Sequence, residues 1–176
     1  MSELTAEQAY VLVQNFLLGT IKVESKTTKK VLEAVPADKS GYRPDAKAKS
    51  ATELVRHIAA AEIRFLDFVI KGVFDTGEIL PGNLATPQDV ANWYETASAE
   101  RFSALTKLTG EQLTQVLDFR GIFQRPAYVF IQTGLLHTIH HRGQLSAYLR
   151  PAGGRVPAIY GESYDSAEAK KQAVPA

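Results

Sequence analysis

Apolar residues recur three or four positions apart in four long segments of this chain, and strand-like alternation is almost absent. This spacing returns a side chain to nearly the same direction after each helical turn, so each segment is predicted to form a helix. The predicted helices cover residues 5–34, 50–71, 86–107 and 125–149. Four helices of this length predict an all-α fold, with a four-helix bundle as the architecture.

The helix ends carry signals of their own. Three of the predicted helices begin at a residue whose hydroxyl can cap free backbone amides: Thr5, Ser50 and Thr86. Residues that end helices follow three of the segments: Pro36, Gly72 and Pro151. Gly19 lies inside the first segment and is expected to mark a bend there.

The connections between the helices are predicted to be irregular and partly long. The first connection, from Pro36 to Lys49, is expected to be a long ordered loop. The third holds a short helical turn at Thr109 and an ambiguous stretch, Val116–Phe123, for which an extended conformation is one interpretation. Long crossovers are therefore allowed, and a strict up-down-up-down order is not predicted. The glycine- and proline-rich tail from Pro151 onward is expected to be a loop.

Composition narrows the class of protein. The 176 residues are most simply one domain, 1–176, and 45% of them are hydrophobic. The net charge of +1 predicts neither a nucleic acid nor a membrane as partner. There are no cysteines, no signal peptide is visible at the N-terminus, and no apolar run is long enough to span a membrane, so a cytoplasmic protein is expected. A lysine-rich strip recurs at helical spacing and is more simply a solvated face than an anion-binding strip: Lys22, Lys26, Lys29 and Lys30.

Histidines provide the candidate chemistry. His137 and His141 lie four residues apart in the last predicted helix, so their side chains point within about 40° of each other. His57 lies at the edge of the apolar face of the second predicted helix and can meet this pair across the bundle core. His140 is also one turn from His137, so the spacing alone leaves the choice of ligands open. Core histidines satisfied by backbone groups and water are the alternative interpretation.

Three neutral imidazoles on one divalent ion would leave the full charge on the metal. Such a site brings bound water to a pKa near 7 or holds an added thiol as thiolate. Nitrogen ligands suit zinc, nickel and iron alike. Glu53 is expected to accept the second ring N–H of His57, and Gln144 to bind metal-bound water, substrate or a structural partner. Thr138 follows the first histidine of the pair where a zinc-protease motif has glutamate, so this helix supplies no general base.

Several of these motifs together resemble the DinB/YfiT-like family, whose members are regarded as metal-dependent enzymes. The resemblance rests on His-x-x-x-His-Arg-Gly-Gln-Leu at 137–145, on Ser-Ala-Thr-Glu-Leu-Val-Arg-His-Ile-Ala at 50–59, and on the Arg43–Pro44 pair and the closing 149–161 segment. It implies a four-helix bundle, often a homodimer, with one divalent metal, most simply zinc or nickel, held by His57, His137 and His141. It gives His140 no ligand role. Characterised relatives include thiol-dependent S-transferases and a mycothiol-dependent isomerase.

Other residues of the last helix carry lesser expectations. Arg142 points away from the histidines and is expected to form a structural salt bridge or anchor a loop. Gly143 suggests the close approach of a neighbouring backbone. Ile131, Leu135 and Ile139 form a second apolar stripe, which makes the helix either central to its bundle or a dimer contact, the latter slightly favoured. In the third helix, Trp93 and Tyr94 are expected in the core, with a pocket lining as the alternative.

The sequence thus predicts a metal-dependent enzyme. It would activate a low-molecular-weight thiol or water for transfer to, or hydrolysis of, a small electrophilic substrate. A non-catalytic module that binds a structural metal or a small ligand is the alternative, and a bundle without any ligand is least favoured. Beyond the supporting roles of Gln144 and Glu53, neither catalytic nor substrate-binding residues are predicted.

Overall fold

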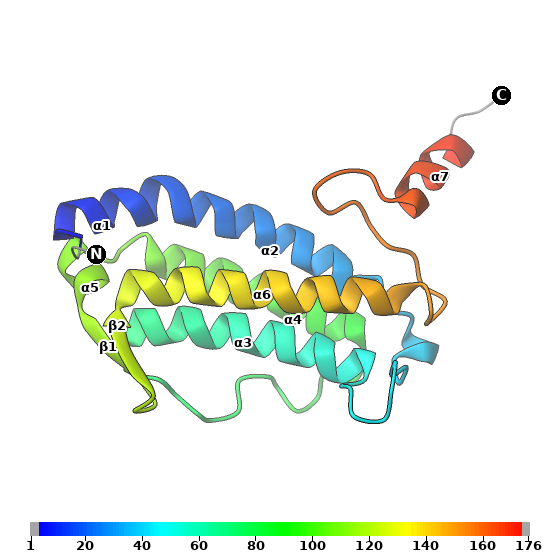
Figure 1. Cartoon of the computed structure of the whole chain (residues 1–176), viewed down its shortest axis with the longest axis horizontal. Helices are drawn as coiled ribbons and strands as arrows, with labels where there is room; N and C mark the ends of the chain where they lie inside the picture. Colours follow the sequence, from blue (N-terminus) through cyan, green and yellow to red (C-terminus); the bar gives the residue numbers. More distant parts are fainter. Residues whose placement is uncertain (1–3, 174–176) are drawn as a thin grey trace.

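A computed structural model describes residues 4–173 and shows a helical bundle with one small hairpin (Figure 1). The prediction of an all-α fold is confirmed. The elements in chain order are α1 (Ala6–Leu12), a π-helical turn (Val13–Leu17), α2 (Leu18–Glu33), a 3₁₀ turn (Ala37–Lys39), α3 (Ala51–Lys71), α4 (Pro87–Leu105), α5 (Gly110–Thr114), β1 (Val116–Phe119), β2 (Phe123–Pro126), α6 (Ala127–Leu149) and α7 (Tyr164–Ala173).

The four long helices form a square in which α3 packs beside α4 and α6, and α2 packs beside the same two helices. Helices α3 and α4 run in the same direction, since Arg56 near the start of α3 donates to the carbonyl of Leu84 just before α4. Later in both helices, Arg101 pairs with Asp67. The connection 72–86 therefore returns along the whole length of the bundle (Figure 1). The second connection is thus the long crossover that the sequence allows. The predicted helix bounds made the first and third connections longer than the second.

Most helix ends lie where the sequence places them. Thr5, Ser50 and Thr86 each form a capping box with the residue three positions later, and Thr109 forms a fourth before the short α5. Gly72 ends α3 in the left-handed conformation, with φ of 73°. The first helix contains a π-helical turn, Val13–Leu17, and Gly19, where a bend was expected, follows two residues later inside α2.

The ambiguous stretch before the last helix is a β-hairpin. Strands β1 and β2 pair antiparallel, with Phe119 opposite Phe123. Arg120 and Gly121 form the turn with φ of 59° and 71°. The hairpin lies beside the end of α3 and the start of α6, and Phe119 stacks on Phe65 of α3 with ring centroids 5.8 Å apart. It therefore places an aromatic wall beside the histidine-bearing helices.

The tail is not entirely loop, because it ends in α7. Ser163 and Ser166 exchange hydrogen bonds between side chains and backbone amides, which caps the start of this helix. The residues that follow are mostly Ala, Glu, Lys and Gln, which favour helix. The glycines and prolines that predicted a loop all lie before this segment of the described chain.

Helix α6 is central to the bundle and packs on both α2 and α3. Ile131 and Leu135 are buried and Ile139 is partly buried within the same chain, so this stripe is core rather than a free dimer surface. Gly143 has open space around it, contrary to expectation. The close approach lies at Gly134, where a β-carbon would meet Phe65 at 2.7 Å. No helix within residues 4–173 is both long and apolar enough to cross a membrane.

Candidate metal centre

Three histidines from two antiparallel helices converge in the bundle. His57 comes from α3, and His137 and His141 come from successive turns of α6. Their ring centroids are 4.5 to 5.0 Å apart in all three pairings. One ring nitrogen from each lies within 4.8 Å of the other two, which is close enough for all three to reach one ion. His140 is exposed on the outer side of His141 and is not part of this group.

The environment of two of the rings, those of His57 and His137, favours their neutral form. Burial is the main cause that lowers both pKa values, and His141 adds to it in each case; the pKa of His137 falls to about 4. Neutral imidazole is the form that binds a metal ion. In addition, Nδ1 of His137 is buried without a hydrogen-bond partner among the described residues. A buried ring nitrogen without a partner is costly unless a ligand completes it, so these residues fit a divalent cation.

Gln144 orients the ring of His141 through a hydrogen bond. Its Nδ1 lies 3.0 Å from Oε1 of Gln144, and Nε2 of Gln144 donates to the hydroxyl of Tyr148 at 3.2 Å. Because the amide oxygen can only accept, this contact places the proton of His141 on Nδ1 and leaves Nε2 free to coordinate. Tyr42, from the loop before α3, packs edge-on against Tyr148. Gln144 thus supports a histidine, rather than lying free toward substrate.

Glu53 does not play the role that the sequence predicted. Its carboxylate accepts from the backbone amide of Ser50 at 2.7 Å and pairs with Arg43 at 2.9 Å. The cap at the start of α3 therefore occupies this side chain, and within residues 4–173 it makes no hydrogen bond to His57. The spacing allows Glu53 either to complete the capping box with Ser50 or to reach His57. The structure shows the contact with Ser50.

A cavity of about 530 Å³ opens beside the histidines. His57 and His137 form part of its lining, so a small molecule in the cavity would reach the candidate centre directly. The other walls come from α3, from the crossing connection 72–86 and from the hairpin turn: Ala60, Ala61, Arg64, Phe65, Phe74, Thr76, Phe119 and Arg120. The sequence did not predict this lining, because it depends on how the hairpin and the crossover fold onto α3.

A second polar group lies buried in the bundle. Glu62 is 3% exposed, and burial raises the pKa of its carboxyl to about 7. The hydroxyls of Tyr94 and Thr138 lie beside it and act in the opposite direction on that pKa. Within the described chain, Oε1 of Glu62 and both hydroxyls lack a hydrogen bond of normal geometry. Tyr94 is core, as expected. Glu62 was missed, although its spacing from Ile58 and Leu66 places it on the buried face of α3.

Arg142 anchors the tail, as the sequence predicted. The side chain is 1% exposed, and its guanidinium pairs with Glu24 of α2 at 2.6 Å. It also donates to the hydroxyl of Tyr160 at 2.6 Å, and that hydroxyl donates to Glu24 at 3.1 Å. One buried arginine therefore joins α2, α6 and the tail next to His141.

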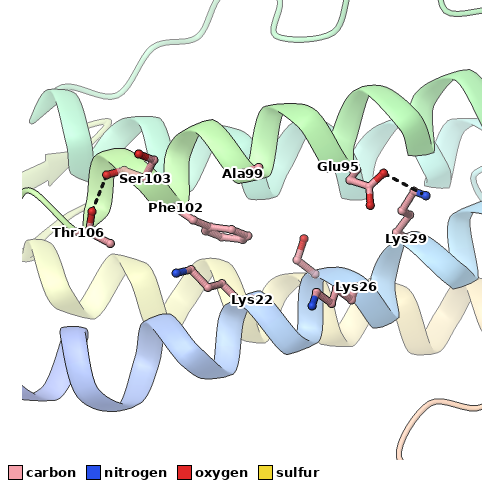
Figure 2. A pocket seen from close by; sticks show the side chains of 9 residues that line it. Lys22, Lys26, Lys29, Glu95, Ala99, Phe102, Ser103 and Thr106 are labelled. Carbon is pink, nitrogen blue, oxygen red and sulfur yellow. Dashed lines mark hydrogen bonds and ion pairs between the residues drawn. The ribbon is translucent and has the colours of Figure 1, made fainter.

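A separate groove of about 570 Å³ lies between α2 and α4 (Figure 2), whereas the three histidines come from α3 and α6. Lys22 and Lys26 project along it, and Phe102 lines it from α4. Lys29 pairs with Glu33 and Glu95, as a solvated helix face commonly does. None of its lining residues is a histidine.

Comparison with known proteins agrees with the fold. Residues 13–173 match the model of the DinB family. An uncharacterized protein of Bacillus subtilis, YjoA, is 28% identical over 128 residues, which span 72% of this chain and 82% of the relative.

Two crystal structures of DinB-like proteins share the fold. The structure of YjoA aligns with a TM-score of 0.68 at 23% identity, over 83% of this chain and 99% of that one. A DinB-like protein of Bacillus cereus aligns with a TM-score of 0.70 at 25% identity, over 82% and 95% of the two chains. The family model spans nearly the whole sequence, and the chain therefore belongs to the DinB family.

Proposed function

We propose that His57, His137 and His141 hold one divalent metal ion and that the protein is a metal-dependent enzyme. The observation that carries this proposal is the convergence of three imidazole nitrogens within 4.8 Å, beside a cavity large enough for a small molecule. Zinc and nickel suit an all-nitrogen donor set. A metal bound there would supply a Lewis acid that lowers the pKa of a thiol or water.

Other residues of the chain would orient a ligand histidine and shape the cavity. Gln144 holds His141 in the tautomer that presents Nε2. Phe65 and Phe119 cover one side of the cavity and limit the access of water to it. The substrate would be a small electrophile, attacked by a low-molecular-weight thiol or by water. Since α3 and α6 pack directly against each other, the fold itself brings the three rings together.

Metal binding is the first test. The purified protein is expected to bind one zinc or nickel ion per chain, measured by elemental analysis after dialysis. His57→Ala, His137→Ala and His141→Ala are each expected to lower the affinity at least about tenfold, while His140→Ala is the matched control and keeps wild-type affinity. Equal loss in the control variant, or full binding in all four, would falsify the metal centre.

Turnover is the second test. Metal-loaded protein is assayed with glutathione, bacillithiol or mycothiol and a model electrophile, and with model esters for hydrolysis. Turnover that disappears in His137→Ala, while circular dichroism shows the helices intact, supports the enzyme.

A non-catalytic binding module is the alternative function. One observation favours it: the residues that line the cavity include no carboxylate to act as a general base. Metal binding without turnover for any thiol or ester, together with loss of fold on chelation, would support the module.

The family resemblance also supports a homodimer, which we propose for this chain. Along the first helix, three large apolar side chains are exposed: Val11, Phe16 and Val23. Phe16→Glu is expected to shift the protein from dimer to monomer in sedimentation velocity.

A further inference from the structure

The cavity beside the histidines has a distinctive charge. Its lining holds two arginines, Arg64 and Arg120, and no aspartate or glutamate. Neither guanidinium forms an ion pair with a carboxylate within residues 4–173. Asp75 and Asp118 do not line the cavity, and their carboxylates accept from the backbone amides of Gly77 and Gly121. The charged side chains of the lining are therefore both arginines, which make it positively charged.

Arg120 is held there at a conformational cost. Its φ of 59° is the only positive value for a residue other than glycine in the described chain. The first central position of such a hairpin turn normally carries Asn, Asp or Gly. A residue with a long side chain in the left-handed region costs about 1 kcal/mol or more, and such strain concentrates at binding sites. The turn thus sets a guanidinium at the cavity in a position that asparagine would occupy with less strain.

Arg64 is fixed by a different means. Its guanidinium donates to the backbone carbonyls of Asp75 and Gly77 in the crossing connection and lies over the ring of Phe74. Carbonyl oxygens orient the group without neutralising its charge. The guanidinium is therefore oriented and still able to attract an anion.

The remaining walls are aromatic. Phe119 stacks on Phe65 and meets Phe74 edge-on, with centroids 4.7 Å apart in the second pair. All three rings line the cavity. Such a surface favours the flat or apolar body of a ligand over a strongly hydrated one.

We propose that this cavity binds an organic anion with an aromatic or similarly apolar body. Its acidic group lies at Arg120, with Arg64 adding to the field, and its body packs on Phe65, Phe74 and Phe119. The other end of such a molecule points to His57 and His137. The inference rests on the proposed metal centre only for the reaction at that end; recognition of the anion depends on residues that are not metal ligands.

Binding of simple probes tests the proposal. Benzenesulfonate has a ring and a charge and is a weak metal ligand, and methyl phenyl sulfone has nearly the same shape without the charge. Isothermal titration calorimetry is done on metal-free and on zinc-loaded protein. Wild-type protein is expected to bind benzenesulfonate at least about tenfold more tightly than the sulfone, and also more tightly than methanesulfonate, which lacks the ring.

Two arginine variants of the hairpin complete the experiment. Arg120→Asn removes the guanidinium and suits the left-handed turn, so it is expected to fold and to lose the preference for benzenesulfonate. Arg125→Gln removes the same charge from β2, outside the cavity lining, and is expected to bind like wild type. Equal binding of the anion and the sulfone by wild-type protein, or equal loss in both variants, would overturn the proposal.

The metal-free titration separates this inference from the proposed function. A preference for the anion that depends on Arg120 and persists without metal supports the inference, even where zinc fails to bind the histidines. Zinc binding without any such preference leaves the metal centre standing and overturns the anion site.

Discussion

At Gly134, the side chain of Phe65 occupies the space that a β-carbon would need. Alanine there would meet the β-carbon of Phe65 at 2.7 Å and its ring at 3.0 Å, and would force apart the two helices that carry the histidines. Gly134→Ala is therefore expected to lower the free energy of unfolding by about 1–3 kcal/mol in urea denaturation. It is also expected to weaken zinc binding, because His137 lies one turn further along α6.

Gly143 is the matched control for this substitution. It lies in the same helix and is exposed, with no atom within 4 Å of a β-carbon. Gly143→Ala is expected to raise stability by about 0.5–1 kcal/mol, the usual gain of alanine over glycine in a helix. Destabilisation of equal size in both variants would contradict the assigned close approach.

Glu62 gives a prediction on pH. Its carboxyl has a pKa of about 7 in the folded chain against the ordinary 4.5 of a glutamate, so it stays protonated after the unfolded chain has lost that proton. Between these pH values the unfolded state binds fewer protons, and stability falls as pH rises. Glu62→Gln, which cannot ionise, is expected to gain up to about 3 kcal/mol relative to wild type between pH 4.5 and pH 8.

This difference is measured by urea denaturation of both proteins with chelator present. The histidines then contribute equally to the free energy of unfolding of both proteins, and their contribution cancels in the difference. Glu78→Gln, in the exposed crossing connection, is the matched control for removal of a carboxylate from the surface. A difference between Glu62→Gln and wild type that does not change with pH would contradict the raised pKa of Glu62.

At the scale of elements, Arg142 determines how the tail is attached. Removing a buried charge from an ion pair leaves its partner uncompensated, so Arg142→Ala is expected to cost about 3–5 kcal/mol. Arg150 pairs with Asp165 at the surface, and Arg150→Ala is expected to cost less than about 1 kcal/mol. Limited proteolysis should cut between residues 150 and 163 faster in the first variant only. Equal rates would show that the arginine does not hold the tail.

The elements that local signals define were predicted from the sequence. Thr5, Ser50 and Thr86 cap helices because a cap involves only residues three positions apart. The hairpin and the direction of α4 were not predicted, because they depend on what the rest of the bundle offers. Phe119, for example, is stabilised by stacking on Phe65, which lies more than fifty residues earlier in the chain.

At the scale of the whole molecule, a metal held between α3 and α6 would stabilise the fold without being required for it. The core contains apolar residues from all four long helices. Zinc at about 100 times its dissociation constant is expected to add about 2.7 kcal/mol to the free energy of unfolding. This gain is expected to be absent in His141→Ala. Chelation should lower Tm while leaving the helical circular dichroism at 25 °C unchanged, and complete unfolding on chelation would instead indicate a structural metal.

The candidate site was predictable to the extent that it depends on helix geometry. The four-residue spacing of His137 and His141 and the position of His57 at an apolar edge sufficed to predict a cluster, and the structure brings these rings together. Glu53 was assigned to the site wrongly, because its cap at Ser50 is satisfied first. Arg64 and Arg120 were missed, because they meet only through the long connection and the hairpin.

The connection 72–86 also limits which shorter versions of this chain can exist. Helix α4 has 19 residues and is about 28 Å long. A fully extended chain needs at least about nine residues to cover that distance, and the connection has fifteen. Up to about five residues could therefore be deleted before the tether becomes too short. Beyond that limit, α4 could enter the bundle only in the opposite direction. Arg101 would then lie far from Asp67, and the apolar face of α4 would lose its register with α2.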